Sequence, residues 1–546
     1  MFTQQPHTMT QSPQTSTDWK SIVAYAGTFL LIPAWDAAAL INPAQGKRPT
    51  PDAPLRRLST AAALGLVLAM IAGRGARGLS AQMALQTLLL LAACAALTGV
   101  LSSALLALMA LLERIPGSAG RALEGLVWWG TGALALIPTG AAAIVIGLGA
   151  LRSGLLAPAF LTGVHPAGIS LRGVLLGAST SAALPAWITA RAAWNSLQDA
   201  AGARRLETAA REAGITFNRL AGLVVGQIVL AEYALNLNGA GRASVAALRD
   251  ANPAQAGGAL LMLSALLAAG HLRALIHERA FNDPPTQGAP DKAAPVLRPW
   301  LVVLGLSVPF LAILAQLTGL AGNPALADPS AIYQLRSALH PLGTDGAGRD
   351  LVARIASGTI TTWGITLSAT LGAMGLGVLW GDTARRAKGW HAEVLHTLAL
   401  GLTLAQPALI ASAIILGGAD SASMAAVAIG LALAPRVASG LANRPLSRAA
   451  LIAAGGMALA AAFQISAGID LLGLGIAGHS ASLGTLWPQP SEVYAGALLA
   501  PGAGLYRLAL KALAANAIST LGLGLIVVAV TKHGPADGRI LSAPLQ

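Results

Sequence analysis

Residues 81–112, AQMALQTLLLLAACAALTGVLSSALLALMALL, form an apolar stretch that decides the fold class. About 17–25 apolar residues in an α-helix cross the roughly 30 Å hydrocarbon core of a bilayer, and this stretch is longer and carries no charge. In the whole chain, 55% of 546 residues are hydrophobic, 10% are charged, and mean hydropathy is +0.65. A soluble domain has about a quarter charged residues. The sequence therefore predicts an all-α, polytopic membrane protein.

Further apolar stretches occur in series on both sides of this one. Their Ala, Gly and Leu content suits close packing of helices. Residues 274–299 are rich in Pro, Gly and charge, and predict a linker near the middle of the chain. The predicted spans are 21–42, 55–73, 81–112, 125–150, 174–194, 222–237, 255–276, 300–322, 359–381, 394–417, 422–440, 449–468 and 506–530.

The positions of Lys and Arg predict the orientation. If Arg56 and Arg57 are cytoplasmic and each later span reverses direction, the loops on that side hold 23 of the 35 basic residues, and the linker and C-terminus are inside. Segment 21–42 carries Asp36 in its middle. It is either an extra span with the N-terminus outside or a re-entrant or interfacial helix. The predicted division is 1–54 (tail and extra hydrophobic helix), 55–276 (first half), 277–299 (cytoplasmic linker) and 300–546 (second half).

Several function classes find no support. Basic residues form no stripe, so nucleic acid is not an expected partner. The single Cys94 excludes an internal disulfide, and no Walker A, GxSxG, HExxH or CxxC motif occurs. We expect no enzymatic activity, no cofactor and no metal site. Tryptophans near span ends, Trp363 among them, predict anchors in the headgroup layer.

The second half contains a specific motif. His340 to Asp350, HPLGTDGAGRD, resembles the HPLGTDxxGRD signature of the second permease in dipeptide, oligopeptide and nickel ABC importers. In that family the motif follows the first span on the outer side and precedes a five-helix core, and the order of predicted spans here is the same. The residues that carry the signature are His340, Pro341, Gly343, Thr344, Asp345, Gly348, Arg349 and Asp350.

The first half resembles the other permease of these importers. Residues 206–214, LETAAREAG, are similar to the YVRTARAKG stretch that docks into the ATPase, and we expect a short surface helix ended by Gly214. By this resemblance Glu207, Ala210, Arg211 and Gly214 contact the ATPase. Residues 232–253 are similar to the ETVFSWPGLGR and ARDYP segments at matching spacing, and Ile137-Pro138 and Leu184-Pro185 fall where the family has mid-helix prolines.

The resemblance implies two pseudo-equivalent six-helix permease halves in a cytoplasmic (inner) membrane. The partners it implies are separate ATP-binding cassette ATPase subunits and an extracytoplasmic substrate-binding protein. Two departures matter. Residues 436–448 join two spans directly where the family has a second coupling helix, and Ser466 stands where the family has a Glu. The alternative is therefore a transport-inactive permease relic that serves as a scaffold or accessory subunit.

Charged residues inside spans are candidates for function, because burying a charge in lipid costs a few kcal/mol. Besides Asp36, they are Glu232 and Asp470. Glu232 matches a family position close to the translocation path, so it either lines that path or makes structural hydrogen bonds. Asp470 has no such match and is a second candidate for the path.

Overall fold

The computed structural model describes residues 53–72, 78–155, 170–199, 205–249, 253–280, 299–405, 422–442, 448–471 and 504–531, together with Leu446, Leu483 and Leu486. Within these ranges the regular structure is helical, apart from one isolated β-bridge between Thr344 and Asp350. The first half contains α2 (Ala53–Ala72), α3 (Ala81–Glu113), α4 (Gly117–Ala135), α5 (Thr139–Arg152), α7 (Leu171–Ser181), α8 (Ala183–Asp199), α9 (Arg205–Arg219), α10 (Ala221–Ala234), α11 (Ala240–Arg249) and α12 (Pro253–Ala280). The second half contains α13 (Pro299–Leu317), the 3₁₀-helix η1 (Pro329–Ala331), α14 (Leu351–Arg386), α15 (Trp390–Leu404), α17 (Ala422–Ala442), α18 (Arg448–Leu471) and α20 (Gly504–Thr531).

Several helices are suited to a membrane. Six helices in the described ranges are long and apolar enough to cross a bilayer, and three further pairs meet the same test if each bent pair is one span. The predicted all-α class with multiple membrane-compatible helices is therefore confirmed. The six are Ala81–Glu113, Gln255–Ala274, Trp300–Leu317, Leu351–Arg386, Ala422–Leu441 and Ala450–Gly468.

Two of the predicted spans, 125–150 and 174–194, are broken helices, which the sequence prediction missed, and a third bend lies just before the predicted span 222–237. The predicted span 125–150 is α4 and α5, bent by 80°. Pro138 lies at the N-terminus of α5, where it lacks an N–H and disfavours helical geometry in the preceding residue. The pair α7 and α8 is bent by 49°, and the pair α9 and α10 by 57°.

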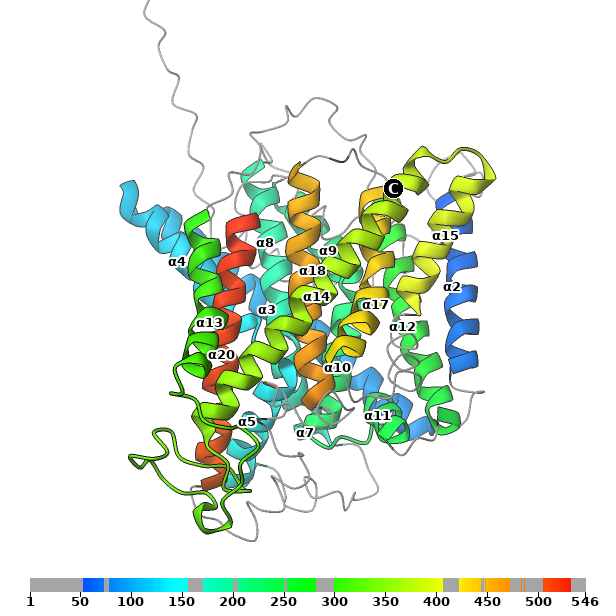
Figure 1. The fold of residues 1–546 in the computed structure, drawn as a ribbon. Coiled ribbons are helices and arrows are strands. Elements are labelled where there is room, and N and C mark those ends of the chain that lie inside the picture. Colours follow the sequence, from blue (N-terminus) through cyan, green and yellow to red (C-terminus); the bar gives the residue numbers. More distant parts are fainter. Residues whose placement is uncertain are drawn as a thin grey trace, which may run out of the picture.

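Described connections lie at both ends of the helical bundle (Figure 1). Helix α11 and the segment 318–350 lie at the lower end in this view, and the turn from α14 to α15 lies at the upper end. Helix α12 ends, and α13 begins, at the upper end. The two ends of the predicted linker thus lie on one side, although α12 continues to Ala280, past the predicted start of the linker at 277.

Glycines let α14 and α17 pack closely. A Cβ at Gly381 of α14 would lie 3.0 Å from the carbonyl oxygen of Ala438 on α17. A Cβ at Gly430 of α17 would lie 3.1 Å from the carbonyl oxygen of Ala369 on α14. Small residues at such contacts allow the backbones of membrane helices to approach, which increases the packing contacts that hold helices together in lipid.

Candidate functional site

Glu232 is fully buried at the end of α10, with an exposed fraction of 0%. Its carboxylate accepts hydrogen bonds from the Thr87 hydroxyl on α3 at 2.6 Å and from the N–H groups of Gly241 and Arg242 at 2.7 and 3.3 Å. Those two N–H groups belong to the first turn of α11, where a helix leaves N–H groups without an intrahelical partner. A carboxylate is favourable there. Glu232 was predicted either to line the translocation path or to make structural hydrogen bonds. The contacts described here are structural hydrogen bonds.

The segment beside Glu232 fits tightly. A Cβ at Gly239 or Gly241 would collide with the Glu232 carboxylate. The Thr87 hydroxyl also accepts a hydrogen bond from the N–H of Ala240 at 2.8 Å. Thr87 was not among the residues predicted for a site. Its only signal was a polar residue within an otherwise apolar helix, and its partners lie about 150 residues away in the chain.

The signature segment 340–350 folds around the side chain of Asp345, which is 2% exposed. Its carboxylate accepts hydrogen bonds from the N–H groups of Ala347 and Arg349, each at 2.9 Å, and pairs with Arg349 Nε at 2.9 Å and with the Arg354 guanidinium. Burial opposes ionisation of Asp345. The Arg349 N–H, the charge of Arg354, the Ala347 N–H and the charge of Arg349 outweigh burial, so the pKa of Asp345 lies below its ordinary value.

The other signature residues complete this fold. His340 Nδ1 lies 3.2 Å from an Asp350 oxygen, and Asp350 caps α14 by accepting from the N–H of Ala353 at 2.9 Å. The Thr344 hydroxyl donates to the carbonyl of Ala331. The structure thus brings His340, Thr344, Asp345, Arg349 and Asp350 together in one ordered segment at the start of α14.

Two glycines and one lysine fix the segment in place. Gly343 and Gly348 have φ angles of +81° and +73°, in the left-handed region that favours glycine. A Cβ at Gly348 would collide with the carbonyl of Asp328. Lys511 of α20 donates to the carbonyl of Leu342, so the segment is attached to a helix far away in the chain.

The predicted ATPase-coupling residues lie on α9. Gly214 is not a C-cap, because the helix continues to Arg219. Ala210 is buried, and Ala209 and Ala213 pack with it against residues of α3 and α8 that include Trp194. One face of α9 therefore belongs to the core. Glu207 and Arg211 lie in α9, but their side chains are outside the described part of the structure.

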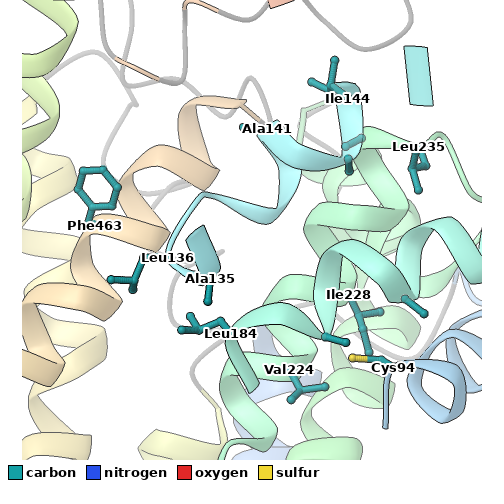
Figure 2. Packing of buried hydrophobic residues seen from close by; sticks show 14 of the residues in the cluster. Cys94, Ala135, Leu136, Ala141, Ile144, Leu184, Val224, Ile228, Leu235 and Phe463 are labelled. Atoms are coloured by element: carbon teal, nitrogen blue, oxygen red, sulfur yellow. The ribbon is translucent and has the colours of Figure 1, made fainter. Parts of the chain in front are cut away.

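A central junction joins the two halves. The buried side chains of Leu136 and Leu184, each beside a break in a bent helix pair, belong to one apolar cluster with Phe463 of α18 (Figure 2). Gln464 Nε2 donates to the carbonyl of Leu136, which ends α4. Trp363 of α14 packs edge-on against Phe463, with ring centroids 6.3 Å apart. We call these five residues the central junction.

Buried polar atoms at the junction lack partners among the described residues. They are the Gln464 Oε1, the Trp363 Nε1 and, one turn along α18 from Phe463, the Ser466 Oγ. Trp363 is 1% exposed, so its predicted position in the headgroup layer is wrong. The junction was not predicted, because an apolar stretch has the same composition whether its helix is straight or broken. The Pro at 138 and the Ser at 466 were the signals that could have indicated it.

Some predicted site residues fall outside the described structure. The side chain of Asp470 does, although its backbone belongs to α18. Asp36 and the whole segment 21–42 do as well.

In comparisons with known proteins, no family model matches this chain and no curated protein matches it.

Proposed function

We propose that this chain is the membrane subunit of an ABC importer for peptides or similar small polar solutes. The solute passes between the two halves at the central junction, separate ATPase subunits supply the energy, and an extracytoplasmic binding protein delivers the solute. The observation that supports the proposal is the junction itself, where two broken helices of the first half meet α14 and α18 of the second half.

The physical basis lies in the breaks. Irregular backbone at membrane depth is tolerated only where it packs within protein or lines a cavity. In many transporters, discontinuous helices near the midplane form the solute site at the interface between repeats. Here the break after Leu136 presents a carbonyl to Gln464 of the other half, and apolar side chains fill the space around it. The junction would then be closed in this conformation, with polar groups that become available when the halves separate.

Coupling to the ATPases would be asymmetric. In the first half, α9 provides the proposed contact through its N-terminal residues. In the second half, α17 ends at Ala442 and α18 begins at Arg448, so residues 443–447 are too few for a coupling helix. The same short connection favours the alternative, a permease relic that acts as a scaffold without transport.

The test is reconstitution of the chain with candidate ATPase subunits, followed by measurement of ATP hydrolysis and solute uptake in proteoliposomes. Uptake of labelled di- or oligopeptides that depends on ATP and on a binding protein supports the importer. Gln464→Ala should lower uptake about tenfold or more, because it removes the hydrogen bond between the halves at a buried site. Gln316→Ala, at the end of α13, should leave uptake unchanged.

Two outcomes separate the alternatives. Stable association with ATPase subunits without any solute-dependent hydrolysis would leave only the scaffold. Failure of any ATPase to bind, with α9 accessible to soluble reagents along its whole length, would contradict both the importer and the proposed role of α9.

A further inference from the structure

An apolar groove runs along the surface of the protein where α14 packs against α17. Its volume is about 580 Å³. On α14 its lining includes every fourth residue from Ile360 to Leu376, and on α17 it includes residues between Ser423 and Leu431. Ser368 and Leu431 are exposed, and both helices are long and apolar enough to cross a bilayer. The groove therefore opens toward lipid, and we call it the α14–α17 groove.

Glycines form the bottom of the groove. A Cβ at Gly364 would meet nothing within 4 Å, and a Cβ at Gly372 would meet only the Cα of Gly430, at 4.0 Å. By contrast, a Cβ at Gly377, farther along α14, would lie 2.5 Å from the side chain of Val437. Glycine inside a helix costs about 0.5–1 kcal/mol relative to alanine. Packing within the described residues does not require Gly364 or Gly372, so what their small size provides is the open groove.

The groove is too narrow for a transmembrane helix. Ile360 and Leu376 are sixteen residues apart on α14, which is about 24 Å at 1.5 Å per residue. A volume of about 580 Å³ over that length gives a mean cross-section of about 24 Å². An α-helix with its side chains is about 10 Å in diameter, or about 80 Å² in cross-section. A single hydrocarbon chain, whose carbon atoms pack about 4 Å from their neighbours, is about 4–5 Å across and fits.

The groove has a polar end. The two glycine contacts described above between α14 and α17 advance in the same direction along both helices, which therefore run parallel. Thr361 and Ser423 thus lie at one end of the groove, near the start of each helix, and Leu376 lies at the other end. Because the signature segment directly precedes α14, the end that carries the hydroxyl groups is the one on the side of that segment.

We propose that the α14–α17 groove binds one acyl chain of a membrane phospholipid. Its volume and its mainly apolar lining with a few polar groups are typical of sites for small molecules. The acyl chain lies on the glycine floor between the apolar side chains, with its methyl end toward Leu376. At the polar end the Thr361 hydroxyl donates to an ester oxygen of the lipid. The bound lipid belongs to the leaflet on the side of the signature segment.

The test uses the purified full-length chain in phosphatidylcholine nanodiscs that contain a small fraction of phosphatidylcholine with a photoactivatable diazirine in its acyl chain. After illumination, mass spectrometry of peptides locates the labelled residues. Labelling per exposed residue should be higher in the groove than on α13, where Phe310 and Leu317 are 62% and 81% exposed. A bound chain remains in place, whereas lipid on an open helix surface exchanges freely. Labelling of the groove no higher than that of α13 overturns the proposal.

Variants that fill the groove tie the labelling to it. Gly364→Leu places a side chain in the open space, and should reduce labelling of the groove to the level of α13. Gly375→Leu is the matched control, because Gly375 is exposed on the same helix, has nothing within 4 Å of its Cβ, and is not part of the groove lining. It should be labelled in the groove as the wild type is. Labelling of Gly364→Leu equal to that of the wild type overturns the proposal.

A second variant and a second measurement complete the test. If Gly364→Leu does not give folded protein, Ser368→Leu fills the groove from the next turn of α14, at an exposed position, and should have the same effect. The oligomeric state is measured in parallel. A groove that is unlabelled in a dimeric wild type, with the dimer lost in the filled variant, would identify a second copy of the chain as the occupant and overturn the lipid.

Discussion

At the scale of single residues, Asp345 is the side chain around which the signature segment folds. It pairs with Arg349 and with Arg354, which is 7% exposed, and it accepts two backbone hydrogen bonds. Asp345→Asn should lower the free energy of unfolding by about 3 kcal/mol, because it leaves Arg354 buried without its counter-charge. Denaturant unfolding and limited proteolysis within 318–350 measure this.

The matched control is Asp328→Asn. Asp328 caps η1 by accepting from the N–H of Ser330 at 2.9 Å, and asparagine caps about as well as aspartate. Its effect should stay within about 0.5 kcal/mol. Equal effects of the two variants would show that the buried ion pairs of Asp345 contribute little.

The pKa of Asp345 predicts a pH dependence of the same segment. Because the folded-state pKa is lowered, ionisation of Asp345 stabilises the fold at every pH above the unfolded-state value of about 3.9. That stabilisation is lost as the pH falls through this value toward the folded-state pKa. A spin label at Ala338→Cys, on a Cys94→Ser background, should become more mobile over this range. With Asp345→Asn added, the label should show no such transition.

At the scale of elements, the connection from α10 to α11 depends on Gly239 and Gly241, which pack against the Glu232 carboxylate. Gly239→Ala should lower the free energy of unfolding by about 1–3 kcal/mol, because its Cβ would collide with the buried Glu232 carboxylate. Gly226→Ala, in the exposed interior of α10 with nothing within 4 Å of its Cβ, should raise it by up to about 1 kcal/mol. Thermal unfolding of both variants decides this, and a destabilised Gly226→Ala would contradict it.

The long apolar helices could be predicted from the sequence, but the breaks within them could not. The stretches 55–73, 81–112 and 359–381 lie within or along α2, α3 and α14, because length and hydropathy alone make a helix in lipid. The breaks after Leu136 and Ser181 were missed, because an apolar stretch has the same hydropathy whether its helix is straight or broken. Gly214 was taken as a helix end, but a glycine in a buried helix face is tolerated where neighbours pack closely.

The candidate sites also differ in how far the sequence predicts them. The signature segment could be found from sequence because its residues are contiguous and bind one another. The contacts of Thr87 and Gln464 could not, because their partners come from distant helices.

At the scale of the whole molecule, the orientation can be tested with single cysteines on the Cys94→Ser background. Ala338 is exposed in the segment 318–350, which precedes α14, and serves as the probe on that side. An impermeant thiol reagent on intact cells should label Ala338→Cys and leave Thr286→Cys unlabelled, because α12 ends and α13 begins at the end of the bundle opposite to the segment 318–350. Permeabilised cells should show labelling of both. A labelled Thr286→Cys in intact cells would reverse the orientation and remove α9 from the cytoplasmic side.

The return of α12 to the side where α13 begins has a genetic consequence. Two halves joined in one chain are made in equal amounts, and a tether of this length keeps each at an effective concentration of about millimolar for its partner. Neither half has to find the other by diffusion or to exclude related subunits. In the proposed importer, selection acts on the pair, so one half can do without a docking element that the other provides, which agrees with the short connection between α17 and α18.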